Sequence, residues 1–186
     1  MKNKVVIITG SSCSGKYTVI SKLLSKYPTF KFLPSETTRT MRDGESDGNP
    51  HIFITTEELH ARSISGKYVV EELINDIYYA TTFDVIENAI ENSPISLKEI
   101  GVDGAMELKK KLGDRCITIF LSVEKAELER RFTTRGTPDF EKRLSRYQYE
   151  FNLGNKMDVV IDNNSDIELT IRTIEGILKL NELGGN

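Results

Sequence analysis

The chain has few cysteines and no long apolar run, and both absences narrow the class of protein. Its two cysteines, Cys13 and Cys116, do not have the spacing of metal ligands. No stretch approaches the roughly twenty apolar residues that a membrane-spanning helix needs. The apolar run after the first four residues is too short for a signal peptide. The sequence therefore predicts a cytoplasmic protein with no membrane partner.

A basic excess is also lacking, because the 186 residues carry a formal net charge of -3. Proteins with a general affinity for nucleic acid usually present a basic face, so no nucleic-acid partner is expected. With 38% hydrophobic residues, the chain can bury one substantial core. We expect a single domain over residues 1–186 with a small inserted lobe, and the sequence indicates no oligomeric state.

Apolar runs alternate with helical patterns along the chain. Strands are predicted at residues 5–9, 116–123 and 159–162. Helices are predicted at residues 17–26, 84–91, 104–112, 125–132 and 167–180. This alternation is typical of an α/β fold, a parallel sheet with helices on both faces. Between residues 34 and 82, short strand-like pieces at 51–55, 68–72 and 77–82 predict an inserted lobe with antiparallel strands.

The first strand leads into a phosphate-binding motif, Gly10, four residues, Gly15 and Lys16, followed by a helix. The two glycines allow backbone torsions that a Cβ would forbid, so successive N–H groups can face a phosphate chain. Lys16 adds a positive charge. The last position of the motif usually holds Ser or Thr as a magnesium ligand, but here it is Tyr17, and Thr18 follows it. The motif predicts a phosphate cradle more firmly than a magnesium ligand.

Two arginine clusters accompany this motif. Arg39 and Arg42 lie among hydroxyl residues, and a second group runs from Arg130 through Arg146. Arginine forks bind phosphate oxygens in a bidentate manner. Two such groups around a phosphate loop suggest that a donor and an acceptor phosphate are brought together, with charge neutralised from both sides.

These motifs resemble those of guanylate kinases. The resemblance is carried by GSSCSGKYT, SETTRTMRDGESDG, LERRFTTRGT and KRL, with VDGAMELKK and MDVVIDNN between and after them. It runs in order through nearly the whole chain. It implies a P-loop core, an acceptor lobe at about residues 34–82 and a short lid at about residues 132–146. It also implies transfer of the γ-phosphoryl group of ATP to GMP or dGMP, with Mg²⁺.

The resemblance further implies a role for each matched residue. The ATP side would comprise Gly10, Ser11, Ser12, Cys13, Ser14, Gly15, Lys16, Tyr17, Thr18 and Asn163. The acceptor side would comprise Ser35, Arg39, Arg42, His51, Glu72, Tyr79 and Thr81. Lys16, Arg39, Arg135 and Arg143 would act on the transferring phosphate, and Thr18 and Glu99 would hold Mg²⁺, Glu99 through water.

The chain departs from the family pattern at the base-reading positions. Val70 stands where the family has a guanine-reading glutamate, and Glu71 and Glu72 are the nearest acids. Side chains alternate along a strand, so Glu72 shares the face of Val70, whereas Glu71 could serve only after a register shift. The family's Asp-x-Asp appears as Glu99-Ile100-Gly101, which lacks the second acid. His51 replaces a tyrosine and keeps a hydrogen-bonding group.

Three functions are compatible with these residues. Lys16 and the arginines of both clusters favour a GMP kinase. Loss of the acid at position 70 leaves open a nucleoside monophosphate kinase with another base preference, because hydrogen bonds that specify the base are removed. Val70, Gly101 and Tyr17 together also leave open a guanylate-kinase-like binding module with little or no turnover.

Overall fold

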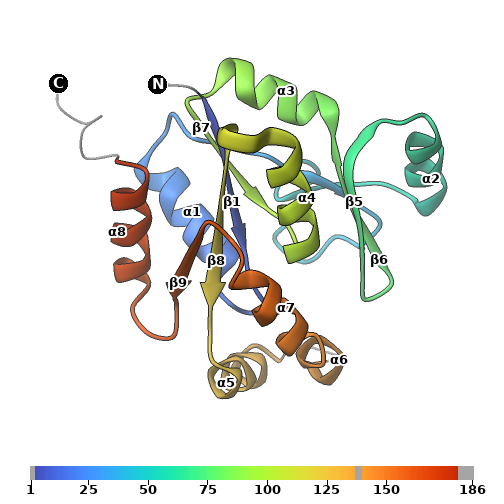
Figure 1. Ribbon diagram of the computed structural model, residues 1–186. Helices are drawn as coiled ribbons and strands as arrows, with labels where there is room; N and C mark the ends of the chain where they lie inside the picture. Colours follow the sequence, from blue (N-terminus) through green and yellow to red (C-terminus); the bar gives the residue numbers. More distant parts are fainter. Residues whose placement is uncertain (1–2, 137–139, 180–186) are drawn as a thin grey trace.

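The computed structural model describes residues 3–136 and 140–179. Five parallel strands form the core sheet in the order β2-β7-β1-β8-β9 (Figure 1). Their bounds are β1 Lys4–Thr9, β2 Lys31–Phe32, β7 Ile95–Glu99, β8 Cys116–Ser122 and β9 Val159–Asp162. The three core strands predicted from apolar runs are confirmed. β7 does not read as an apolar run, because Ser96 and Lys98 interrupt it.

Helices cover both faces of this sheet (Figure 1). On one face α1 (Lys16–Lys26) and α8 (Ile167–Ile177) pack against the side chains of Val6 and Ile8. On the other, α3 (Phe83–Asn92), α4 (Val102–Leu112) and α7 (Tyr147–Gly154) pack against those of Val5 and Ile7. Alternate residues of β1 thus enter two cores, as expected for a central strand buried on both sides. A short 3₁₀ helix, Gly113–Arg115, links α4 to β8.

The inserted lobe has its own sheet, in the order β4-β3-β6-β5, and one helix, α2 (Thr56–Ile64). Its strands are β3 Ser35–Thr37, β4 His51–Phe53, β5 Tyr68–Ile74 and β6 Ile77–Thr82. The predicted antiparallel pairing holds for β3–β6 and β5–β6. β3 and β4 run parallel, because the connection over residues 38–50 returns the chain to the same end of the sheet. The capping box of Thr55 and Glu58 starts α2, which hydrophobic periodicity alone did not predict.

After β8, the chain continues through α5 (Lys125–Arg135) and α6 (Phe140–Leu144) into α7. A separate small core joins these helices, formed by Val123, Leu128 and Phe132 with Leu144 packed against it. α5 and α6 therefore stand beside the carboxyl end of the core sheet rather than on one of its faces (Figure 1). Among the described helices, none has the length and apolarity to cross a membrane.

Gly154, the last residue of α7, packs tightly against the core sheet. A Cβ built there would lie 2.4 Å from ring atoms of Phe120 in β8. We expect Gly154→Ala to lower the free energy of unfolding by about 1–3 kcal/mol, because the ring and helix must separate. Gly176→Ala in α8 is the matched control, since no atom lies within 4 Å of its Cβ position.

The control should raise the free energy of unfolding by about 0.5–1 kcal/mol through helix propensity alone. Urea denaturation of the two variants measures both effects. Equal stabilisation by the two substitutions would contradict the tight packing at Gly154.

Candidate active site

A cavity of about 530 Å³ lies between the loop after β1, the inserted lobe and the α5–α7 segment. Most of the predicted site residues line it: Gly10, Ser12, Cys13, Gly15, Lys16, Tyr17, Thr18, Ser35, Arg39, Arg42, His51, Glu72, Tyr79, Glu99, Arg135 and Arg143. Ser11, Ser14, Thr81 and Asn163 are buried and are not part of the lining. Residues from five separate segments of the chain therefore meet around one space.

The loop between β1 and α1 owes its shape to backbone conformations with positive φ. Gly10, Cys13 and Gly15 have φ values of 149°, 63° and 95°. A Cβ at Gly10 would also lie 2.8 Å from the carbonyl oxygen of Leu121, so only glycine fits against β8. Cys13 adopts the left-handed conformation without being glycine, which is uncommon and costs energy.

Lys16 crosses the mouth of this loop. Its Nζ donates hydrogen bonds to the carbonyl oxygens of Gly10 (2.9 Å) and Ser11 (3.0 Å) and lies 3.8 Å from a carboxylate oxygen of Glu99. The lysine therefore stands between the loop and the end of β7, and its charge faces the cavity.

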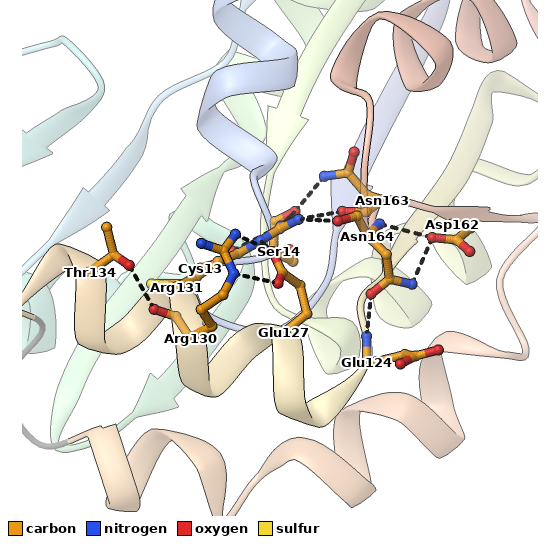
Figure 2. Close-up of polar contacts among 10 residues, drawn as sticks. All are labelled: Cys13, Ser14, Glu124, Glu127, Arg130, Arg131, Thr134, Asp162, Asn163 and Asn164. Atoms are coloured by element: carbon orange, nitrogen blue, oxygen red, sulfur yellow. Dashed lines mark hydrogen bonds and ion pairs between the residues drawn. The ribbon is translucent and has the colours of Figure 1, made fainter.

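Arg131 ties the loop to the turn after β9 (Figure 2). Its guanidinium donates to the carbonyl oxygen of Asn163 at 2.6 Å and, at 3.4 Å, to those of Cys13 and Ser14. Glu127 accepts the Arg131 Nε–H at 2.7 Å and fixes the plane of the fork. Arg131 belongs to the predicted arginine cluster from Arg130 to Arg146. Only the structure shows that it supports the loop, whereas Arg135, Arg143 and Arg146 line the cavity.

Asn163 has a supporting position rather than an open one. Its Nδ2 donates to the carbonyl oxygen of Ser14 at 2.7 Å (Figure 2). Its Oδ1 accepts from the Thr170 hydroxyl at 2.7 Å. Asn163 is buried and is not part of the cavity lining, although each end of its amide keeps further hydrogen-bonding capacity. The structure thus places Asn163 behind the loop, where it holds the backbone in shape.

The lobe presents its arginines on one wall. Arg39 is buried, forms a 2.8 Å ion pair with Glu45 and stacks on Phe53 with 5.5 Å between guanidinium and ring centre. The same carboxylate accepts the backbone N–H of Arg42 at 2.8 Å. Glu45 therefore fixes the loop that carries both arginines, a role that the sequence did not reveal.

Positive charge is concentrated here. Burial lowers the pKa of Arg42, and the nearby guanidinium groups of Arg39 and Arg143 lower it further. Arg39 and Arg42 come from the lobe and Arg143 from α6, so the two arginine clusters converge on the same space. An anion bound here would relieve the repulsion among these three cations.

The α5–α7 segment supplies the opposite wall. Arg143 donates to the Ser12 hydroxyl at 3.2 Å, and its buried Nε has no partner among the described residues. Arg135 lies in the last turn of α5, before Gly136 ends the helix. Arg146 and Glu150 of α7 also line the cavity, and Glu150 was not among the predicted residues. Residues 137–139 of the predicted lid lie outside the described residues.

Strand β5 contains Val70, Glu71 and Glu72, the positions at which the sequence left the base-reading acid open. Val70 is buried in the hydrophobic core, and Glu71 is exposed and accepts a hydrogen bond from Ser63 at 2.9 Å. Glu72 faces the cavity on the Val70 side of the strand, as alternation predicts. Its position is therefore the one from which an acid of this strand can reach a ligand.

The Glu72 carboxylate lies on the first turn of α4. Its two oxygens accept the backbone N–H groups of Gly101 (3.0 Å) and Gly104 (2.9 Å). Burial raises the pKa of Glu72, and these two hydrogen bonds oppose the rise by favouring the charged form. A Cβ at Gly101 would lie 2.4 Å from Glu72 Oε1, so the glycine at that position makes room for the acid.

Two further polar groups of the acceptor side are buried without partners in the described part of the chain, His51 Nδ1 and the Thr81 hydroxyl. Burial, with the charges of Arg39 and Lys98 adding to it, lowers the pKa of His51 from 6.5 to about 4. The imidazole is therefore neutral at pH 7. It can donate one hydrogen bond to an anion but brings no charge.

For a metal ion, Thr18 and Glu99 offer oxygen donors on the loop side of the cavity. The described residues contain no group of three or more His, Cys, Asp or Glu side chains that could hold a metal by themselves. Mg²⁺ commonly keeps several waters and binds through one or two protein oxygens plus substrate phosphates. A hydroxyl and one carboxylate beside a phosphate loop fit that mode.

The lowered pKa of His51 has a measurable consequence. In His60→Gln protein, His51 is the only imidazole, and we expect its proton resonances to titrate with a midpoint near 4. Between pH 6.5 and 4 the unfolded chain would then bind a proton that the folded chain does not, so stability falls as pH falls through this window. A midpoint near 6.5 would show that His51 is solvated.

Comparison with known proteins identifies the family. The family model "Guanylate kinase" matches residues 2–181. A guanylate kinase from Prochlorococcus marinus subsp. pastoris is 35% identical over 184 residues, covering 96% of this chain and 100% of that protein. One from Salinibacter ruber is 34% identical over 165 residues, covering 86% and 87%. The crystal structure of guanylate kinase from Anaplasma phagocytophilum matches with a TM-score of 0.79 at 25% identity, covering 96% of this chain and 86% of that one. The chain belongs to the guanylate kinase family.

Proposed function

We propose that this protein transfers the γ-phosphoryl group of ATP to GMP, giving ADP and GDP. One observation carries the proposal: the loop lysine, the lobe arginines and the α5–α6 arginines all line a single cavity. A phosphate cradle alone would support any nucleotide-binding protein. Cations on both sides of it support transfer between two phosphates, and the family membership supports GMP as acceptor.

The reaction needs no strong base in the protein. An oxygen of the acceptor phosphate is already a nucleophile, so catalysis consists of in-line alignment, exclusion of water and neutralisation of charge. Lys16 is proposed to neutralise the β- and γ-phosphates. Arg135 and Arg143 approach from the opposite wall and are proposed to offset the charge of the group in transfer.

The acceptor phosphate is assigned to the lobe. Arg39 and Arg42 offer forked donors, and Ser35, Tyr79 and the neutral His51 offer single ones around the same wall. Arg39 is pre-oriented by its ion pair with Glu45 and by the ring of Phe53, so little side-chain entropy is lost on binding.

Glu72 is assigned to the base. A guanine presents two neighbouring N–H donors, at N1 and at the 2-amino group, and a carboxylate accepts both. Each oxygen of Glu72 already accepts one backbone N–H, and each keeps a further lone pair for the ligand. The Thr81 hydroxyl, buried and unpaired in the described chain, is proposed to complete the recognition of the base.

Mg²⁺ is proposed to be held through Thr18 and, by way of water, Glu99, together with ATP phosphates. When bound, it would neutralise phosphate charge and help to orient the transferring group. Tyr17 occupies the position that usually holds the Ser or Thr ligand of Mg²⁺, and its side chain is about half exposed.

The proposed organisation is one domain over residues 1–186, with an acceptor lobe at about 34–82 and a short lid at about 132–146. The ion pair of Lys142 with Asp76 (2.5 Å), which joins α6 to the β5–β6 hairpin, supports closure of the lid against the lobe. dGMP is proposed as a second acceptor. A cytoplasmic location stays a prediction.

A coupled assay of ADP formation with ATP and Mg²⁺ tests the function. GMP, dGMP, IMP, AMP, CMP and UMP are offered in turn against a control without acceptor. Turnover selective for GMP and dGMP is expected. Turnover selective for another base would change the substrate, and folded protein inactive with every acceptor would refute the kinase.

Lys16→Ala should lower kcat by at least about a hundredfold, because the charge that offsets the β- and γ-phosphates is lost. Lys22→Ala, in the same helix, is the matched control: its ammonium is exposed and forms an ion pair with Glu168 at 2.6 Å. Steady-state kinetics of both variants, with circular dichroism to verify the fold, measure the difference. Undiminished turnover by Lys16→Ala would remove the loop from the mechanism.

Glu72→Gln should lower kcat/KM for GMP by about 10- to 100-fold through a higher KM for GMP, because a hydrogen bond to a charge is weakened. KM for ATP should change little, and discrimination between GMP and AMP should narrow. Glu71→Gln is the neighbouring control and should behave like the unsubstituted protein, since Glu71 is exposed and outside the cavity. Equal losses for GMP and ATP would contradict the assignment of Glu72 to the base.

A further inference from the structure

Lys98 is a fully buried lysine in the central sheet. It lies in β7 beside Ile7 of β1, so its stem is on the face covered by α3 and α4. Its Nζ donates to the Ser35 hydroxyl oxygen at 2.6 Å and to the carbonyl oxygen of Leu33 at 3.2 Å. Neither the phosphate motif nor the arginine clusters pointed to this residue.

The burial of this ammonium is costly. Its surroundings on the sheet are apolar, and a leucine or methionine could fill the same volume without desolvating a charge. Burial lowers the pKa of Lys98 to about 7, and the carboxylates of Glu72 and Glu99 oppose the shift. Both acids line the cavity, as does Ser35, whose hydroxyl the ammonium contacts.

The position of Lys98 is the junction between core and lobe. β2 ends at Phe32 in the core sheet, and β3 begins at Ser35 in the lobe sheet. The ammonium binds the chain at both ends of this short connection, at Leu33 and at Ser35. A residue of the rigid core therefore fixes where the lobe begins.

The direction of the hydrogen bond determines what Ser35 can do. In its charged form, which the carboxylates of Glu72 and Glu99 favour, Lys98 only donates, so the Ser35 oxygen then accepts from it. The single O–H of Ser35 is then free to point elsewhere, and Ser35 lines the cavity beside the lobe arginines. The serine is thereby set as a donor toward an anion.

We propose that Lys98 is a positioning residue for the acceptor: it orients the Ser35 hydroxyl as a hydrogen-bond donor to the phosphate of the nucleoside monophosphate. Lys98 does not touch the acceptor and acts through Ser35. The inference rests on the proposed function, because it assigns the lobe wall to the acceptor phosphate.

Binding measurements by calorimetry test it, with GMP, with guanosine and with a non-hydrolysable ATP analogue. Lys98→Met should weaken GMP binding by about tenfold or more, because the donor at Ser35 is no longer oriented. Affinity for guanosine, which lacks the phosphate, and for the ATP analogue should stay unchanged. Lys109→Met is the control, since the Lys109 ammonium also donates to a backbone carbonyl, that of Cys116 at 2.7 Å, away from the cavity.

A double-mutant cycle with Ser35→Ala separates positioning from a structural effect. If Lys98 acts through Ser35, Lys98→Met should weaken GMP binding little further once Ser35 is alanine. Additive losses, or equal losses for guanosine and GMP, would overturn the proposal, as would Lys98→Met protein that binds GMP as tightly as the Lys109→Met control.

The stability of each variant is measured by thermal unfolding, and Lys98→Leu replaces Lys98→Met if the latter does not fold. Failure of this inference is distinct from failure of the proposed function. Unsubstituted protein that phosphorylates GMP, together with unaltered GMP binding in the Lys98 variants, removes the role of Lys98 alone. Unsubstituted protein that neither binds nor phosphorylates GMP removes both.

Discussion

The site depends on one constraint, the common edge at which the parallel strands of the core sheet end. β1 ends in the phosphate loop, β7 ends at Glu99, and β9 ends at the turn that contains Asn163. Because parallel strands place their carboxyl ends together, segments far apart in sequence become neighbours there. The loop is held from behind by this convergence: Asn163 and Arg131 both bond its backbone, and they come from β9 and α5. The phosphate-binding conformation is thus a property of the sheet edge as a whole, and the strained torsion of Cys13 is tolerated because the surroundings impose it.

The departures from the family pattern on the acceptor side form one connected change. Glu72 accepts the N–H groups of Gly101 and Gly104 at the start of α4, where the helix dipole favours negative charge. A side chain at either glycine would collide with this carboxylate. Glu72 in this position therefore excludes an acid at position 101. Val70 packs into the core, and Glu72, two residues further along the same face of the strand, faces the cavity. The acid at position 72 and the glycine at position 101 thus have one steric explanation.

The sequence predicts the parts of this protein that depend on local pattern. The loop from Gly10 to Lys16, the flanking strand and helix, and the side of β5 that carries Glu72 all follow from glycine placement and periodicity. Features that depend on distant contacts were not predictable. The brace of Asn163 on Ser14 joins residues 149 positions apart, and Asn163 alone reads equally well as a ligand. The parallel pairing of β3 with β4 is set by an irregular connection whose path leaves no periodic signal. Lys98 interrupts an apolar run, and a lysine in a sequence argues against a buried strand. Only the structure shows the hydroxyl and the carbonyl oxygen that accept its hydrogen bonds.

The electrostatics of the cavity explain why the lobe and the α5–α6 segment belong to one mechanism. Burial lowers the pKa of Arg42, and the guanidinium groups of Arg39, in the lobe, and Arg143, in α6, lie close enough to lower it further. Repulsion of this kind opposes the close approach of these cations. A phosphate with two negative charges reverses the sign of the interaction and favours the arrangement in which both walls face the same anion. In the proposed lid closure, the binding energy of the acceptor would stabilise the closed cavity from which water is excluded. The same cations would then couple the proposed closure to the arrival of the phosphates between which transfer occurs.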